Sequence, residues 1–328
     1  MPASSATDRR RVVVTGAAGN IGRALVEACL ARGDEVTAID LAEQHDPRVH
    51  AVRADLTRPG DWEQELAGAE VVVHAAAIVA ESGDRDRFVE VNVVATRRVA
   101  EAAADAGVGR LVHLSSIVVY GNRFPAGSLR TESDPLVPTG GPYTDTKIAA
   151  EHAVLAVCAE RDLPVTIVRP GDVYGPRSVP WVLRPLAMMR RRQFVLVDGG
   201  RWPLSPIHID DLVTGILVAG DAEVAAGRTY NLAGPPVSAR SFFAHHAQHT
   251  GTRLRSLPRP AALAAAEVAT RAAALTGRSA PFSPEAIEYV THPGGYAGDR
   301  AASELGVSPT IPLEQGLPAC LVAADQPG

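Results

Sequence analysis

Short apolar runs alternate with longer amphipathic stretches through the first half of the chain. The runs are rich in β-branched side chains and span residues 11–15, 35–40, 49–53, 71–76, 110–115 and 165–169. Between them, apolar positions recur at helical spacing over residues 21–32, 61–66, 88–106 and 143–160. Buried strands that alternate with helices indicate βαβ units and a parallel sheet covered on both faces. We therefore expect an α/β fold with a Rossmann-type, doubly wound parallel sheet.

The pattern changes after Arg169, where Pro and Gly become frequent and the elements become irregular. A run at 228–232 resembles a strand that returns to the sheet, and residues 241–280 are Ala-rich with a helical pattern. We expect residues 1–169 to form a dinucleotide-binding Rossmann domain. Residues 170–328 are expected to form mainly a smaller substrate-binding region, with some segments returning to the sheet.

The overall composition excludes several classes of protein. Lys and Arg number 32 against 37 Asp and Glu, and a net charge of −5 argues against a general nucleic-acid or anionic-membrane binder. No apolar stretch is long enough to span a bilayer, and the N-terminus lacks the apolar core of a signal peptide. The three cysteines lie far apart and are expected in the core rather than in disulfides. We expect a cytoplasmic protein with a small-molecule substrate and neither a nucleic-acid nor a membrane partner.

A glycine triplet lies between the first expected strand and the first helix. In the segment Thr15–Gly22, Gly16 permits a tight turn, Gly19 lets the backbone approach a pyrophosphate, and Gly22 lets the helix pack closely on the strand. The amides at the start of the helix then face the phosphates. This arrangement predicts a dinucleotide site, although a triplet alone is also found in ordinary glycine-rich turns.

Acidic and small residues follow the next strands in positions that fit the same site. Asp40 ends the second strand, 24 residues after Gly16, where a carboxylate accepts hydrogen bonds from the ribose hydroxyls and repels a 2′-phosphate. We therefore expect NAD rather than NADP. Asp55 and Leu56 follow the third strand and are expected to meet the adenine, and the small side chains of Ala75, Ala76 and Ala77 leave room for the dinucleotide at the fourth.

Three polar residues predict acid–base chemistry at an alcohol or ketone. Tyr143 and Lys147 are four residues apart in a helical pattern and share one face. A lysine ammonium beside the phenol is expected to lower the tyrosine pKa toward the working range, so that Tyr143 exchanges a proton with substrate. Ser116 follows the fifth strand, at the sheet edge where open α/β sheets bind ligands, and its hydroxyl would hydrogen-bond the substrate oxygen.

Taken with these residues, the chain resembles an extended short-chain dehydrogenase/reductase of the NAD-dependent epimerase/dehydratase superfamily, in particular its 3β-hydroxysteroid dehydrogenase and dihydroflavonol reductase-like branch. The resemblance runs in family order over about residues 11–235. Besides the residues above, it rests on Asn92-Val93-x-x-Thr96, Ser115-Ser116-x-x-x-Tyr120-Gly121, Arg169-Pro170-x-x-Val173-Tyr174-Gly175-Pro176, Ile207-His208-Ile209-Asp210-Asp211 and Tyr230-Asn231-Leu232.

The resemblance implies a set of functional residues. Ser116, Tyr143 and Lys147 are implied to be catalytic, and Thr146 replaces a serine found in many relatives. The implied contacts of NAD are Gly16, Gly19, Asn20, Ile21, Gly22, Asp40, Asp55, Leu56, Ala75, Ala76, Ala77, Asn92, Tyr143, Lys147 and Pro170. Relatives often form homodimers through the helices that correspond here to residues 88–106 and 143–160, so we expect a homodimer.

The remaining candidates for chemistry are interpreted more simply. His74 is expected to be a packed strand residue, and His208 to make a structural hydrogen bond. We expect no metal site, because His245, His246 and His249 have helical spacing but no nearby cysteine motif or carboxylate. Trp181 and Trp202 are equally compatible with a substrate pocket and with plain packing. The Pro-rich loop 124–138 is expected to border the active site.

Three functions remain open. The first is an NAD-dependent oxidoreductase that interconverts a secondary alcohol and a ketone on a hydrophobic ring-type substrate, such as a steroid, flavonol or polyketide. The second is a sugar-nucleotide epimerase or dehydratase with tightly bound NAD. The third is a catalytically silent protein that senses the cofactor, and the complete set of Ser116, Tyr143 and Lys147 counts against it.

Two positions favour the first function over the second. The resemblance implies that sugar-nucleotide relatives carry an Asn at the position of Asp172 and a diphosphate-binding Arg at the position of Leu204. An Asp would repel a diphosphate, and a Leu would remove a charge-assisted bidentate contact. We therefore expect weak binding of nucleoside-diphosphate sugars, with Arg201 or Arg191 as the replacement clamp if the alignment slips by one or more residues.

Overall fold

The computed structural model describes residues 9–80, 83–123, 125–275 and 282–326. Its centre is a seven-stranded sheet with the order β12-β7-β5-β4-β1-β2-β3, in which every neighbouring pair is parallel. The strands are β1 (Arg11–Thr15), β2 (Glu35–Asp40), β3 (His50–Arg53), β4 (Val71–His74), β5 (Arg110–Leu114), β7 (Val165–Pro170) and β12 (Thr229–Leu232). The expected doubly wound parallel sheet is confirmed.

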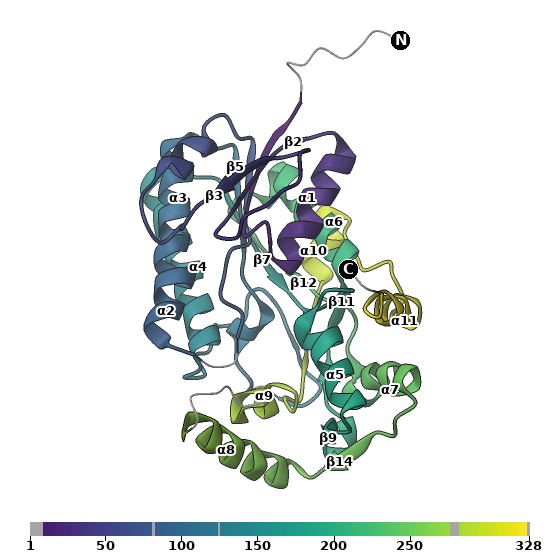
Figure 1. The fold of residues 1–328 in the computed structure, drawn as a ribbon. Helices are drawn as coiled ribbons and strands as arrows, with labels where there is room; N and C mark the ends of the chain where they lie inside the picture. Colours follow the sequence, from purple (N-terminus) through teal and green to yellow (C-terminus); the bar gives the residue numbers. More distant parts are fainter. Residues whose placement is uncertain (1–8, 81–82, 124, 276–281, 327–328) are drawn as a thin grey trace, which may run out of the picture.

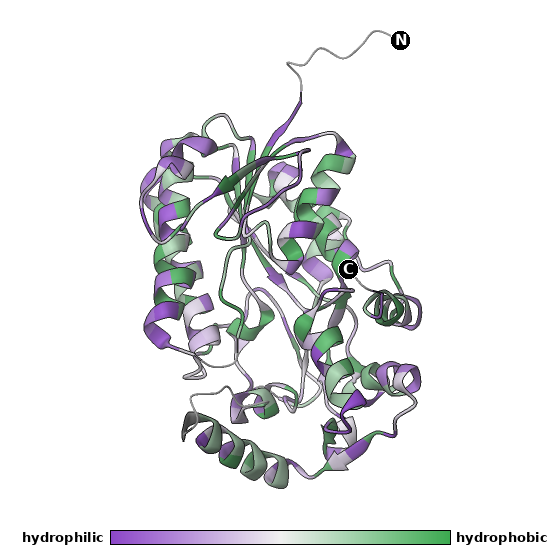
Figure 2. Cartoon of the chain, viewed as in Figure 1, coloured by the Kyte–Doolittle hydropathy of each residue, from purple (hydrophilic) through white to green (hydrophobic). Residues whose placement is uncertain are grey.

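Helices cover both faces of the sheet (Figure 1). On one face, α1 (Asn20–Arg32) and α6 (Ile209–Asp221) share a buried core with the strands. On the other, α3 (Ala95–Asp105) and α4 (Pro142–Arg161) complete a second core. The central strands are hydrophobic along their length because both of their faces are buried (Figure 2).

Two expected helices differ from regular α-helices. Residues Asp61–Leu66 form a 3-10 helix, and the stretch expected over 88–106 consists of α2 (Arg85–Val89), a π-helical turn (Glu90–Val94) and α3. The π turn contains Asn92, which is 1% exposed and points into the protein. Such turns are rare and recur near functional sites.

The second half forms a smaller layer at the carboxyl edge of the sheet. Its helices are α5 (Arg184–Arg190), α7 (Ala239–Thr250), α8 (Arg259–Leu275), α9 (Pro284–Tyr289) and α11 (Leu313–Ala323). Helix α10 (Asp299–Leu305) instead packs into the core that α1 and α6 share with the sheet. The short strands of the smaller layer pair as β8 (Asp172–Tyr174) with β11 (Pro206–His208), β9 (Val195–Val197) with β14 (Arg255–Leu257), β10 (Pro203–Leu204) with β13 (Val237–Ser238), and β6 (Leu129–Arg130) with β15 (Gly295–Tyr296).

The Ala-rich material is not one continuous helix. α7 ends at Gly251, whose φ of +65° is the left-handed conformation that glycine adopts at a helix end. Strand β14 follows before α8 begins. Residues 276–280, the end of the expected stretch, lie outside the described residues.

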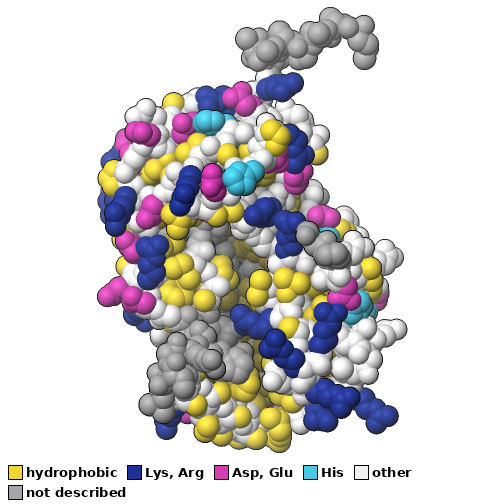
Figure 3. Space-filling view, in the orientation of Figure 1, with side chains coloured by type: hydrophobic (Ala, Val, Ile, Leu, Met, Phe, Trp, Pro, Cys, Tyr) yellow, Lys and Arg dark blue, Asp and Glu magenta, His cyan; other side chains and the backbone are white. Residues whose placement is uncertain are grey.

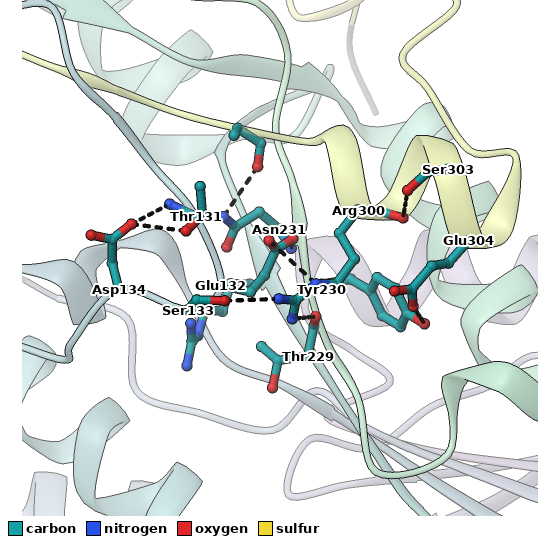
Figure 4. A network of polar contacts seen from close by, with 12 residues as sticks. Thr131, Glu132, Ser133, Asp134, Thr229, Tyr230, Asn231, Arg300, Ser303 and Glu304 are labelled. Atoms are coloured by element: carbon teal, nitrogen blue, oxygen red, sulfur yellow. Dashed lines mark hydrogen bonds and ion pairs between the residues drawn. The ribbon is translucent and has the colours of Figure 1, made fainter.

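A polar network fixes the edge strand β12 to the smaller layer (Figure 4). The Asn231 backbone N–H donates to Glu132 Oε1 at 2.8 Å. The Arg300 guanidinium donates to the Thr229 carbonyl at 3.2 Å and to Ser133 Oγ at 3.1 Å. Residues from the loop after β6, from β12 and from α10 are thus held together. Among the described residues, no helix combines the length and apolar character needed to cross a membrane.

Candidate active site

The carboxyl ends of the central strands meet at one edge of the sheet, and the residues expected to be functional follow them. In Figure 3 the face seen there is hollowed in the middle, with hydrophobic side chains and Lys or Arg side chains on its borders. This is the edge at which open α/β sheets bind ligands.

The glycine loop forms a close backbone cradle. Gly16 has a φ of +68°, and a Cβ there would lie 2.6 Å from the Ala76 backbone. A Cβ on Gly22 would overlap the Gly16 carbonyl oxygen, while the Gly19 amide donates to that oxygen at 3.0 Å. Side chains are therefore excluded where β1, β4 and the start of α1 meet. This cradle fits the pyrophosphate of a dinucleotide, with Asn20 and Ile21 opening the helix.

Asp40 lies directly beside this loop. Its carboxylate accepts hydrogen bonds from the Ala18 and Ala42 amides, each at 2.9 Å. Asp40 also pairs in register with Arg53 on β3, whose guanidinium donates to the Leu41 carbonyl at 3.2 Å. The sequence interpretation considered only residues next to Asp40 in the chain and missed this cation, which the sheet brings close from the neighbouring strand.

Asp55 and Leu56, which follow β3, and Asn92 in the π turn make contacts within the protein beside the expected cofactor site. Asp55 Oδ1 accepts from the Thr57 amide at 3.0 Å and the Thr57 hydroxyl at 2.7 Å, and these bonds lower the pKa of Asp55. Leu56 is buried in the core beneath them. The Asn92 amide donates to the Ile78 carbonyl at 3.1 Å and to Thr146 Oγ1 at 3.1 Å, and its oxygen accepts from the Ile78 amide at 2.7 Å.

Asn92 is predicted to contact the cofactor, and its side chain also makes hydrogen bonds within the protein. It ties the segment after Ala75–Ala77 to helix α4, one residue before Lys147. This geometry supports a positioning role. The replacement of serine by threonine at 146 keeps the hydroxyl that Asn92 uses.

Ser116, Tyr143 and Lys147 are brought together at the end of β5. Ser116 precedes the 3-10 helix Ile117–Tyr120, and its hydroxyl lies close enough to the Tyr143 phenol to oppose the effect of burial on the pKa of Tyr143. Lys147 is 4% exposed, and its Nζ donates to the Leu114 carbonyl at 2.7 Å. The three side chains thus converge from two elements, as the spacing in the sequence predicts.

The expected effect of Lys147 on the tyrosine is wrong for this structure. Burial raises the pKa of Tyr143 to about 12, and the opposing influence is the hydrogen bond with Ser116. Burial also lowers the pKa of Lys147 to about 8, against a smaller upward influence of Glu151. Desolvation dominates because Lys147 and Glu151 are buried and Tyr143 is only partly exposed.

A buried ion pair supports Lys147 from the next helical turn. Arg169 donates to both oxygens of Glu151, at 2.8 and 2.7 Å, and to the Tyr120 hydroxyl at 2.7 Å. Tyr120 donates in turn to Asn231 Oδ1 at 2.7 Å. The sequence interpretation assigned no function to Glu151, although its position four residues after Lys147 was a usable signal.

Asp172 and Leu204, the two positions that argued against binding of sugar nucleotides, lie in surroundings that differ from the expectation. Leu204 is fully buried in the core of the smaller layer, so it borders no open site. Asp172 is 1% exposed, and its carboxylate accepts from the Ser205 amide at 2.7 Å and the Tyr289 hydroxyl at 2.5 Å. Burial raises the pKa of Asp172 to about 6. The expectation of a free charge facing the ligand is therefore wrong.

The interpretations of His74 and His208 are confirmed, whereas His249, expected to have no nearby carboxylate, lies 2.9 Å from Asp325 Oδ2. His74 is 1% exposed and hydrogen-bonds Thr15 at 2.7 Å and Thr96 at 2.9 Å. His208 caps α6 by accepting from the Asp210 amide at 3.1 Å. His246 lies 2.9 Å from the Trp181 carbonyl. In the loop 124–138, Phe124 lies outside the described residues, and Leu129–Arg130 pairs with β15.

Comparison with known proteins agrees with this geometry. Residues 12–233 match the model of the NAD dependent epimerase/dehydratase family. The 4-hydroxy-2-methyl-3-oxo-4-farnesyl-3,4-dihydroquinoline-1-oxide ketoreductase of Stigmatella aurantiaca is 31% identical over 321 residues, covering 94% of this chain and 95% of the relative. The sterol-4-alpha-carboxylate 3-dehydrogenase (decarboxylating) of Homo sapiens is 31% identical over 220 residues, or 65% of this chain and 58% of the relative.

Among solved structures, MoeE5 in complex with UDP-glucose and NAD superimposes with a TM-score of 0.77 and 26% identity, over 95% of this chain and 98% of that one. The relatives are enzymes, and the family depends on NAD. The family model spans the glycine cradle, the residues Ser116, Tyr143 and Lys147, and the edge strand β12, so the match does not depend on one short motif. The chain therefore belongs to the NAD-dependent epimerase/dehydratase family.

Proposed function

We propose that the protein is an NAD-dependent oxidoreductase that interconverts a secondary alcohol and a ketone on a hydrophobic ring-type substrate. The observation that carries this proposal is the convergence of Ser116, Tyr143 and Lys147 at the end of β5, on the same sheet edge as the glycine cradle. The cofactor would be held by the cradle, Asp40, the Ala75–Ala77 segment, Tyr143, Lys147 and Pro170. When bound, NAD supplies or accepts the hydride.

The chain's own residues handle the proton. In the reducing direction the Tyr143 phenol donates its proton to the oxygen that becomes the alcohol, and Ser116 donates a hydrogen bond to that oxygen. Lys147 stays charged below its pKa of about 8 and would hold the ribose hydroxyls of the nicotinamide half of the cofactor. In the oxidising direction the same groups act in reverse.

Aromatic side chains at the carboxyl edge support a hydrophobic substrate. Trp181 and Tyr289 lie with ring centroids 6.2 Å apart, and Tyr289 lies 5.5 Å from His292. Trp181 and Tyr289 both keep part of their surface exposed. The names of the quinoline ketoreductase and sterol dehydrogenase relatives agree with a ring-type substrate.

The decisive variant is Tyr143→Phe, assayed with NADH and a panel of ring ketones. We expect NAD affinity within a few-fold of wild type and turnover lowered by ~10²-fold or more, because the phenolic proton is lost. The matched control is Tyr230→Phe. In the wild type the Tyr230 hydroxyl donates to Glu304 at 2.8 Å, away from Ser116, Tyr143 and Lys147. Near-normal turnover of Tyr143→Phe would overturn the mechanism.

A sugar-nucleotide epimerase or dehydratase is the second candidate, favoured by the likeness to the structure solved with UDP-glucose and NAD. Such an enzyme returns the hydride within one cycle and yields no net NADH. Calorimetric titration with UDP- and dTDP-sugars in the presence of NAD, together with absorbance at 340 nm, separates the two. Micromolar binding without net NADH formation would favour this second function.

We also propose that the protein forms a homodimer through the α2–α3 and α4 side. Large apolar side chains on these elements are exposed: Val89 by 39%, Val94 by 42% and Leu155 by 45%. A second copy of this chain would bury them. Light scattering on wild type and on Leu155→Glu tests this, with a dimer expected for the first and a monomer for the second.

A further inference from the structure

A second phenol lies at the active-site edge, held in place by a buried carboxylate. Tyr289, the last residue of α9, donates its hydroxyl hydrogen to Asp172 Oδ1 at 2.5 Å. The Ser205 amide donates to the other carboxylate oxygen at 2.7 Å. Asp172 is 1% exposed, so this acceptor is fixed and the direction of the Tyr289 O–H bond is fixed with it.

The packing of α9 brings this phenol close to the start of α4. The Glu285 carboxylate, one turn before Tyr289, occupies the space where a Cβ on Gly141 would lie. Gly141 precedes α4 and stands two residues before Tyr143, while Asp172 stands two residues after Pro170 at the end of β7. Helix α9 therefore connects the start of α4, through Glu285, with the segment after β7, through Tyr289. The proximity of Tyr143 adds to the upward shift of the Tyr289 pKa.

The surroundings of the Tyr289 ring suit contact with a bound molecule. Trp181 tilts against it at 48°, and His292 meets it edge-on at 71°. The Tyr289 side chain keeps part of its surface exposed, whereas Asp172 does not. Because the phenolic hydrogen is donated to Asp172, the Tyr289 oxygen can interact with a further polar group only through its lone pairs, as an acceptor.

We propose that Tyr289 is a substrate-recognition residue that accepts a hydrogen bond from a hydroxyl or N–H group carried by the ketone in addition to its reacting carbonyl. The preferred substrates would then be ring ketones with a second, hydrogen-bond-donating group. This inference rests on the proposed ketone reduction at Tyr143 and specifies the substrate class of the same site.

Binding to the protein loaded with NAD⁺ tests the inference without turnover. The probes are 2-tetralone, its ring-hydroxylated derivatives (positional isomers of one another) and the matching methoxy compounds. Each is titrated by calorimetry. We expect at least one hydroxyl isomer to bind about 5- to 10-fold more tightly than 2-tetralone, the scale of one net hydrogen bond. The methoxy compounds offer no donor and should show no gain.

Tyr289→Phe should abolish this gain and leave the affinity for 2-tetralone unchanged. Tyr230→Phe is the matched control and should keep the gain. Tyr289→Leu, a second variant, should lose the gain and also weaken every probe by removing the ring. Persistence of the hydroxyl preference in Tyr289→Phe, an equal loss for all probes, or absence of any preference in wild type would each overturn the inference.

Reduction of the same probes with NADH separates this inference from the proposed function. A hydroxyl preference that depends on Tyr289, with no oxidation of NADH by any probe, would contradict the ketoreductase and leave the recognition role standing. Reduction of all probes with no preference for the hydroxylated ones would support the ketoreductase and contradict the recognition role of Tyr289.

Discussion

Asp40 shows how a single carboxylate is fixed so that it can select a cofactor. Two backbone amides, of Ala18 and Ala42, hold its oxygens at 2.9 Å each. A negative charge locked there opposes a 2′-phosphate, and the nearby Arg53 guanidinium already donates to the Leu41 carbonyl. We therefore predict that selectivity for NAD depends on the Asp40 carboxylate, although the Arg53 guanidinium lies nearby.

Removing this carboxylate should reverse the preference between the two cofactors. In Asp40→Ala, Arg53 becomes the nearest charged group on the facing strand, so we expect NAD affinity to fall about tenfold and NADP affinity to rise. Fluorescence titration with NADH and NADPH measures both. The double variant Asp40→Ala/Arg53→Ala is the control and should lose the gain for NADPH. An unchanged NAD to NADP ratio in the single variant would contradict this role.

Asp172 makes a second residue-scale prediction, because burial raises its pKa from an ordinary 3.8 to about 6. A carboxyl whose pKa is higher in the folded than in the unfolded chain stabilises the fold while protonated. That contribution is complete below pH 3.8 and is lost as the pH rises through about 6. Over this window the protein should lose up to about 3 kcal/mol of its free energy of unfolding through this group.

Urea unfolding between pH 4.5 and 8 on wild type and Asp172→Asn isolates the effect. Asparagine keeps an acceptor oxygen but does not titrate, so the difference in free energy of unfolding between the two proteins should shift in favour of Asn as the pH rises. Other titrating groups cancel in this difference. A difference that stays constant with pH would show that Asp172 does not titrate in this range.

At the scale of elements, the sequence predicted the features that depend on residues close together in the chain. The central strands were predictable because strands buried on both faces are dense in β-branched residues, as in Val71–His74. The proximity of Ser116, Tyr143 and Lys147 was predictable because i, i+4 spacing on α4 and a strand end at Ser116 are local signals. The two-residue strands β6 and β15 pair across more than 160 residues of chain, and no local pattern indicates them. Tyr289 was missed for the same reason, since only the tertiary fold brings α9 to Asp172.

The contact between α9 and α4 gives the element-scale prediction. Gly141 has an ordinary extended conformation (φ −76°, ψ 140°), so alanine suits its backbone, but its Cβ would take the place of the Glu285 carboxylate. Because a flexible side chain gives way cheaply, Gly141→Ala should cost under about 1 kcal/mol of stability. The displaced Glu285 should shift α9 and raise KM for ketones severalfold, with NAD affinity unchanged.

A double-mutant cycle checks that the effect passes through Glu285. Gly141→Ala should raise KM in the wild-type background and have little further effect in Glu285→Ala, where the space is open. Additive effects in the double variant would mean that Gly141 acts independently of α9.

At the scale of the whole molecule, one chain of buried polar contacts joins the two halves. It runs from Glu151 on the catalytic helix through Arg169 on β7 and Tyr120 to Asn231 on β12. From there Glu132 and Arg300 continue it to the smaller layer (Figure 4). The side chains of Arg169 and Glu151 are only 6% and 1% exposed, so neither charge has water to replace its partner.

Breaking this pair on one side should therefore be costly. Arg169→Met leaves the Glu151 carboxylate buried one helical turn from Lys147, and removal of one partner of a buried pair costs about 3–5 kcal/mol. Glu151→Leu/Arg169→Met removes both charges and should recover more than half of that loss. The matched control is Arg161→Met, which breaks the exposed pair with Asp105 (side chains 40% and 72% exposed) and should cost under about 1 kcal/mol.

The same variants separate support of the fold from support of the catalytic lysine. An unpaired Glu151 in Arg169→Met would hold the Lys147 ammonium more strongly, because Glu151 already raises the pKa of Lys147 against the larger effect of burial. The alkaline limit of ketone reduction, if set by Lys147, should move to higher pH in Arg169→Met and to lower pH in the double variant. Stability losses with no movement of this limit would assign the network to the fold alone. Opposite movements in the two variants would show that the Glu151–Arg169 ion pair also adjusts the charge of Lys147.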